Sequence, residues 1–110
     1  MRVAPVGLWA NRENTFELGS ETAALTHGHP SGYLSAGFLA LLIEEIVSGS
    51  SLEASVETAK AALVPQPGHE DVLNAVENSQ IFAQSAGRNG DVSKLGQGWV
   101  AEEALAIALY

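Results

Sequence analysis

The fold of this chain follows from the stretch SGYLSAGFLALLIEEIV, which occupies residues 31–47. Apolar side chains cover nearly every side of this segment until Glu44 and Glu45, and they do not alternate with polar residues as in a strand. A helix that is apolar all round is surrounded by neighbours. The stretch therefore predicts a central helix. We expect it to end at Ser48 and Gly49, where glycine can adopt the left-handed conformation that closes helices.

Helical spacing of apolar residues continues on both sides of this segment. Residues 14–26 predict a helix with a small inner face, which permits close packing against a neighbour. The face consists of Phe16, Ser20, Ala23, Ala24 and His27. Residues 52–63 carry the apolar stripe of an amphipathic surface helix, formed by Leu52, Val56, Ala59 and Leu63. We expect Ser50 and Glu53 to form a capping box at its start.

Two further helices are predicted in the second half of the chain. One begins at Glu70 and Asp71, whose carboxylates suit the positive end of a helix dipole, and it stops at Gly87. The other covers residues 100–110. The pattern as a whole predicts an all-α fold, a compact bundle of about five to six helices. We expect it to form a single domain over residues 1–110.

The composition limits the classes of function. Of the 110 residues, 46% are hydrophobic and 16% charged, so the chain can form a core. Thirteen acidic residues against five basic ones give a formal net charge of −8, which disfavours nucleic acid and anionic membranes as partners. The apolar run at residues 33–43 is about half as long as a bilayer span. The absence of cysteine fits a reducing compartment, and we expect a cytoplasmic protein.

Two of the three histidines, His27 and His29, are separated by a single residue in the predicted connection between two helices. They could be two metal ligands, but a zinc site needs about three or four, and no cysteine is present to help. The simpler interpretation is a tight turn, in which Gly28 permits an unusual backbone and Pro30 occupies the first turn of the next helix. Ser31 or His29 would then cap that helix.

Other candidates for chemistry give weaker signals. Arg2 and the segment Gly96-Gln97-Gly98-Trp99 could each approach a phosphate, although this segment is more simply a close passage between helices, with Trp99 as a core anchor. Adjacent helical residues diverge by roughly 100 degrees, so they cannot jointly hold a proton or a cation. The pairs Glu44-Glu45 and Glu102-Glu103 are therefore interpreted as solvated faces. No dinucleotide fingerprint or Ser-His-Asp arrangement is discernible.

Three segments carry a more specific signal when they are taken together. They read MRVAPVGL at residues 1–8, AALTHGHP at residues 23–30 and LGQGWVAEEAL at residues 95–105. In this order and at these separations they resemble the ADP-ribosylglycohydrolase family. The resemblance implies an all-α fold. For full-length members, it also implies removal of ADP-ribose from modified side chains with the help of a pair of magnesium ions.

The resemblance also implies which family features this sequence does not contain. In the family, acidic magnesium ligands and a glycine-rich loop for the diphosphate precede the Met-Arg segment, and an Asp-x-Asp motif follows the Gly-Trp helix. Neither is found in these 110 residues. By matching positions, His27 lines the ADP-ribose pocket and Arg2 belongs to the loop beside it. His29 and Pro30 match a variant of the motif for which a turn role fits at least as well as ligand contact.

We therefore expect a truncated ADP-ribosylglycohydrolase-like protein that cannot hydrolyse ADP-ribosyl bonds alone. It would hold no metal and retain part of an ADP-ribose-binding wall with low affinity. The alternative is a non-enzymatic helical module that self-associates, as a homodimer, through apolar faces that include Leu105, Ile107 and Leu109. A third hypothesis is a split enzyme whose missing ends are supplied by a partner.

Overall fold

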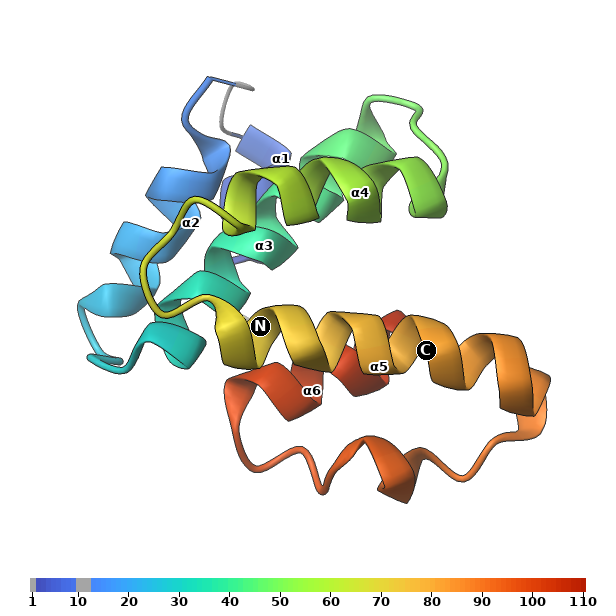
Figure 1. Ribbon diagram of the computed structural model, residues 1–110. Helices are drawn as coiled ribbons and strands as arrows, with labels where there is room; N and C mark the ends of the chain where they lie inside the picture. Colours follow the sequence, from blue (N-terminus) through green and yellow to red (C-terminus); the bar gives the residue numbers. More distant parts are fainter. Residues whose placement is uncertain (1, 10–12) are drawn as a thin grey trace.

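Figure 1 shows the computed structural model of the protein, which describes residues 2–9 and 13–110; Met1 lies outside them. The described residues form six α-helices and two 3-10 helices, with no strand. The α-helices are α1 (Ala4–Trp9), α2 (Thr15–Ala24), α3 (Pro30–Val47), α4 (Leu52–Leu63), α5 (Glu70–Ala86) and α6 (Ala101–Leu109). The 3-10 helices are η1 (Gly87–Asn89) and η2 (Val92–Leu95). The radius of gyration, 13.0 Å, is typical of a compact domain of about this length, so the predicted all-α bundle is confirmed.

Helix α3 runs through the middle of the molecule and contacts the other five α-helices (Figure 1). Most of the core gathers around it. The core side chains include Leu34, Phe38, Leu41 and Leu42 of α3, Val56 and Leu63 of α4, Val72 and Val76 of α5, and Leu105 of α6. The helix ends at Val47, with Ser48 as its C-cap, and Gly49 follows with a φ of +98°. Both the central helix and its glycine stop are as predicted.

By length and composition, Pro30–Val47 would also suit a membrane crossing, with a mean hydropathy of 1.2 over 18 residues. Half of this window is buried inside the protein. The core helix of a globular protein has the same composition, because neighbouring helices cover most of its sides. The packing around α3 accounts for its apolar character.

Helices α2 and α3 approach each other closely because glycines lie where they cross. A Cβ atom at Gly37 would stand 2.7 Å from the carbonyl oxygen of Phe16, and Gly19 faces the same contact from α2. The predicted small inner face therefore exists. Two of its expected members, Ala24 and His27, are exposed instead, because α2 ends at Ala24 and the chain turns away.

The start of α4 differs from the prediction. Its N-cap is Ser51, whose hydroxyl oxygen accepts a hydrogen bond from the Ala54 backbone N–H at 3.2 Å. The Ser50 hydroxyl instead donates to Glu45 Oε2 at 2.9 Å. The expected capping box of Ser50 and Glu53 is therefore wrong. Ser50 and Ser51 are adjacent, and Ser50 is hydrogen-bonded to the Glu45 carboxylate, so Ser51 is the residue that caps α4.

Glu44 is buried, with only 7% of its surface exposed, so its interpretation as part of a solvated face is wrong. It lies three residues after Leu41 and four after Ala40, both of which are buried, and residues at these separations share one face of a helix. Its Oε2 atom has no hydrogen-bond partner among the described residues. The neighbouring Glu45 is half-buried.

The second half of the chain folds back on itself. Helix α5 ends at Gly87, where φ is +59°, and α6 packs against both α5 and α3. The Tyr110 ring lies 5.0 Å from the Phe82 ring, centroid to centroid. The Tyr110 hydroxyl donates to the Gly87 carbonyl oxygen and accepts from the Gly90 N–H. Tyr110 thereby ties the end of α6 to the turn after α5.

Asp91 begins η2, as expected of an aspartate before a helical turn. Its Oδ1 accepts hydrogen bonds from the Ser93 hydroxyl at 2.7 Å and from the Ser93 N–H at 3.1 Å. These bonds, the hydroxyl first, favour the ionised carboxyl and lower its pKa. The stability that this cap contributes is present above the ordinary aspartate pKa, and it is lost as the pH falls through the lowered one.

Candidate functional site

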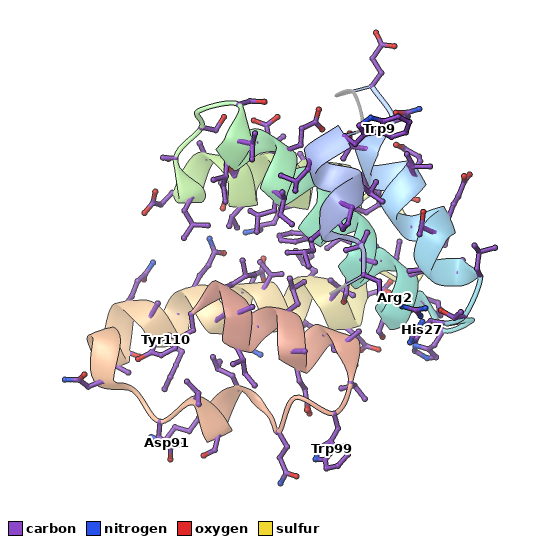
Figure 2. The ribbon with its side chains drawn as sticks, turned by 180° about the vertical axis from the view of Figure 1, so that it is seen from behind. Arg2, Trp9, His27, Asp91, Trp99 and Tyr110 are labelled. Atoms are coloured by element: carbon purple, nitrogen blue, oxygen red, sulfur yellow. The ribbon has the colours of Figure 1, made fainter. Side chains whose placement is uncertain are left out.

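The structure brings Arg2 and His27 together although they are far apart in the sequence. Arg2 precedes α1, and His27 lies in the turn between α2 and α3; Figure 2 shows their side chains as neighbours. Thr26 connects them. Arg2 Nη2 donates to Thr26 Oγ1 at 3.1 Å, and Thr26 Oγ1 lies 2.8 Å from His27 Nδ1.

The contact between Thr26 and His27 is compatible with either tautomer of the imidazole. The Thr26 hydroxyl can donate to His27 Nδ1 at 2.8 Å, or it can donate to the Ala23 carbonyl oxygen at 3.4 Å and accept from Nδ1–H. In both arrangements the other ring nitrogen, Nε2, is not engaged by Thr26, so it can contact a ligand as a donor in the first and as an acceptor in the second.

The structure confirms most of the features predicted for the turn between α2 and α3. Pro30 is the first residue of α3, and His29 is its N-cap, with Nδ1 accepting from the Ser31 N–H at 3.3 Å. Gly28 does not have a positive φ, so the expected unusual backbone is not observed. His29 therefore has a structural task, while the ring of His27 is exposed.

A pocket of about 460 Å³ opens beside Arg2 and His27. This volume lies within the range of small-molecule sites, roughly 300–1,000 Å³. The walls come from the end of α2, the first half of α3 and one face of α6, and they are mainly apolar. The lining residues include Arg2, His27, Ser35, Leu39, Ala104 and Leu105. Arg2, Thr26 and His27 form one polar edge of the lining, which we call the Arg2–His27 edge.

Sequence reasoning did not find the part of this pocket that lies between α3 and α6. Ser35 and the alanines of α6 carry no motif, and the two helices are more than fifty residues apart in the chain. The one available signal was the serine itself, a polar residue within the otherwise apolar central segment.

A second hollow, of about 600 Å³, lies between α5, η2 and α6. Its lining mixes polar and apolar side chains, among them Asn74, Asn78, Phe82 and Lys94. It contains neither Arg2 nor His27. We therefore base the candidate site on the pocket beside the Arg2–His27 edge, where polar groups converge on an apolar cavity.

The glycine-rich segment before α6 is not a free anion site. The N–H groups of Gln97 and Gly98 both donate to Glu103 Oε2, each at 3.0 Å. A phosphate would have to displace this carboxylate, so the expected approach of a phosphate is not supported. Trp99 is 86% exposed, and its prediction as a core anchor is wrong. The turn that Glu103 holds directs the indole outward, as Figure 2 shows.

The carboxylates in this structure do not fit a magnesium pair. Magnesium prefers several oxygen ligands in a near-octahedral arrangement. The described residues contain no group of three or more His, Asp or Glu side chains that could hold a metal ion. Several acidic side chains have other partners: Asp71 accepts from Ser31, Asp91 from Ser93, and Glu103 from the backbone.

Comparison with known proteins gives one match. A family model described as ADP-ribosylglycohydrolase matches residues 1–110, which is the whole chain. No curated protein and no solved structure matches the chain. The resemblance of the three sequence segments is therefore supported by a match that also includes the helices between them.

Proposed function

The chain belongs to the ADP-ribosylglycohydrolase family over its whole length, and from this premise we propose that its pocket binds ADP-ribose. The observation that carries the proposal is the hydrogen-bonded series Arg2–Thr26–His27 beside a mainly apolar cavity. ADP-ribose combines an anionic diphosphate with apolar ring faces. The two parts of the site suit these two parts of the ligand.

Arg2 provides the positive charge that a diphosphate needs. One guanidinium N–H bonds to Thr26, and the remaining donors can form the paired bonds that guanidinium groups make with phosphates. Among the described residues, no carboxylate lies within ion-pair distance of Arg2. In a chain with a formal net charge of −8, this is one of few places where an anion is attracted. His27 adds a second polar group, the ring nitrogen Nε2 that Thr26 does not engage.

The affinity should be low. Arg2 and His27 are both exposed, so water and salt weaken their attraction for an anion. Hydrolysis is not part of the proposed function of these 110 residues, because their carboxylates do not fit the magnesium pair that the family uses. When bound, such ions would polarise the bond that breaks or activate water. The site as described binds and orients a ligand.

Removal of the charge at Arg2 should weaken ADP-ribose binding by about fivefold. Arg2→Met keeps most of the side-chain volume and removes a charge-assisted contact, which is worth about 1 kcal/mol at an exposed position. His27→Ala should have a similar effect, since it removes the second polar contact of the same edge. Titration calorimetry with ADP-ribose at low salt measures both changes.

Lys94→Met is the matched control, because it removes the same charge from an exposed side chain in the other hollow. We expect it to leave the affinity for ADP-ribose unchanged. If Lys94→Met weakened binding as much as Arg2→Met, the attraction would come from net charge and not from the Arg2–His27 edge. Wild-type protein that bound no ADP-ribose at millimolar concentration would overturn the proposed function.

A second candidate function is a self-associating helical module. Among the exposed large apolar side chains, Trp9 is 89% exposed and Trp99 86% exposed. Figure 2 shows the two indoles at opposite ends of the molecule. The apolar face that the sequence predicts is partly wrong, because Leu105 belongs to the core and Leu109 packs against it. The apolar surface at Trp9 or at Trp99 is the better candidate for an interface.

If this second function holds, light scattering at micromolar concentration should give about twice the monomer mass of 11.5 kDa. Trp9→Ser and Trp99→Ser, made separately, should show which end forms the interface. The variant at the interface should return the mass to that of a monomer, and the other should not. A wild-type monomer would rule out this candidate and leave the ADP-ribose proposal unaffected.

A further inference from the structure

The pocket beside the Arg2–His27 edge contains a buried hydroxyl group without a partner. Ser35 lines the pocket and is 5% exposed, and its Oγ atom has no hydrogen-bond partner among the described residues. Buried polar side-chain atoms nearly always have a partner, from the protein or from outside it. Ser35 Oγ is covered in this structure, and rotation of the side chain about χ1 would bring it to a polar group of a ligand in the pocket that the residue lines.

The walls around Ser35 are formed by small side chains. On α3, the next pocket residues are Ala36 and Leu39; on α6, they are Ala101, Ala104 and Ala108, which recur at helical spacing. Alanines on α6 leave a space between the helices that is bounded by methyl groups. Such a space suits a thin, planar group that is apolar on its faces and polar at its edge.

We propose that this part of the pocket holds the purine ring of the ligand and that Ser35 Oγ hydrogen-bonds to the ring edge. The inference rests on the proposed function, because ADP-ribose is the ligand whose purine is placed. The anionic part of the ligand then extends to the Arg2–His27 edge of the same pocket. Ser35 is the residue that distinguishes a heteroaromatic ring with polar edge atoms from a purely apolar one.

Three ligands separate the two halves of the site. Adenosine has the ring without a phosphate, ribose 5-phosphate has a phosphate without the ring, and ADP-ribose has both. Chemical-shift titration of the ¹⁵N-labelled full chain gives an affinity and a location for each. We expect adenosine to shift the amide signals of Ser35 and Ala104. Ribose 5-phosphate should shift those near Thr26 and His27.

Ser35→Ala should weaken adenosine and ADP-ribose by about fivefold, the usual scale of one neutral hydrogen bond, and leave ribose 5-phosphate unchanged. The variant should fold, since alanine favours a helix interior. Ser20→Ala is the matched control: Ser20 Oγ is also buried and has no partner in the described part of the chain, but Ser20 does not line the pocket. It should leave all three affinities unchanged.

Ala104→Leu provides a second test that does not depend on Ser35. Ala104 is exposed and lines the pocket from α6, so a larger side chain there should fill the space without disturbing the core. We expect it to weaken adenosine more than ribose 5-phosphate. Its unfolding midpoint, compared with that of the wild type, checks that the fold is kept.

The outcomes separate the inference from the proposed function. If ADP-ribose binding responds to Arg2→Met but not to Ser35→Ala or Ala104→Leu, the purine lies elsewhere and the inference is overturned while the proposed function stands. Equal effects of Ser20→Ala and Ser35→Ala would also overturn it. If the wild type binds none of the three ligands, both fall.

Discussion

Incubated with magnesium and an ADP-ribosylated protein, the 110-residue chain should release ADP-ribose no faster than the uncatalysed reaction. Metal ions in such sites contribute several kcal/mol to the stabilisation of the transition state. Because each 1.4 kcal/mol corresponds to about a factor of ten in rate, loss of this contribution alone lowers the rate by about a thousandfold or more. The measurement is chromatography of free ADP-ribose over hours, with magnesium and with a chelator. A full-length active family member serves as the positive control.

The expected absence of turnover follows from how the carboxylates are used. Asp71 and Asp91 lie at helix starts and accept hydrogen bonds from serines, and the Glu103 carboxylate accepts two backbone N–H groups. Glu44 is buried with one oxygen unpartnered, but no second carboxylate joins it in a group that could hold a metal within the described residues. Magnesium would therefore have to bind with too few protein oxygens.

Two variants make the test decisive. If magnesium-dependent release were observed, Glu44→Gln and Asp71→Asn should be compared with the wild type. Loss of release in either one would identify a ligand and contradict the interpretation given above. Release that persisted in both, or that persisted in the chelator, would indicate a contaminating enzyme or a reaction that does not need the metal.

The helices were predictable because apolar spacing and capping residues, which determine where helices form, are local features of the sequence. The central segment is apolar on all sides, and α5 begins and ends at residues with strong positional preferences. Errors arose where two residues compete for one role. Ser50 and Ser51 are adjacent, and only the carboxylate of Glu45 decides that the second one caps α4. Spacing along the sequence does not contain this information.

The sequence does not predict the burial of Trp99 and Glu44 correctly, because their positions in the fold differ from the usual preference of their residue types. Trp99 was assigned to the core because tryptophan is large and apolar, yet the turn held by Glu103 directs it outward. The divergence of adjacent helical residues predicts a solvated face for Glu44, yet Glu44 is buried and shares a face with Leu41. In both cases the packing of the neighbouring segments overrode the preference of the side chain.

The candidate site was only partly predictable. His27 and Arg2 were named from the resemblance of their motifs, and the structure places them in hydrogen-bond contact with Thr26. No periodic pattern links two residues that lie 25 positions apart. Ser35 could not be assigned at all, since the pocket that it lines is completed by residues of α6. Contacts between distant helices are fixed by tertiary packing, which a single sequence does not display.

Replacement of Gly37 by valine should destabilise the protein by about 3 kcal/mol, at the upper end of the cost of overpacking a core. A Cβ atom at this position would stand 2.7 Å from the Phe16 carbonyl oxygen and closer still to Ser20 Oγ. The serine can rotate away, but the carbonyl belongs to the backbone of α2 and cannot. Valine adds two further methyl groups to the same contact. The change is a large fraction of the roughly 5–15 kcal/mol that stabilises a domain.

Urea unfolding followed by circular dichroism measures this loss as a lower midpoint with an unchanged slope. Gly28→Ala is the matched control, because no described residue other than its two chain neighbours lies within 4 Å of a Cβ atom there and its φ is not positive. We expect this control to be neutral or to gain up to about 1 kcal/mol, since alanine restricts the unfolded chain. If Gly37→Val kept the wild-type midpoint, α2 and α3 would have to lie further apart than described. The pocket whose walls they form would then have a different shape, so this result would also remove the basis for placing a ligand beside His27.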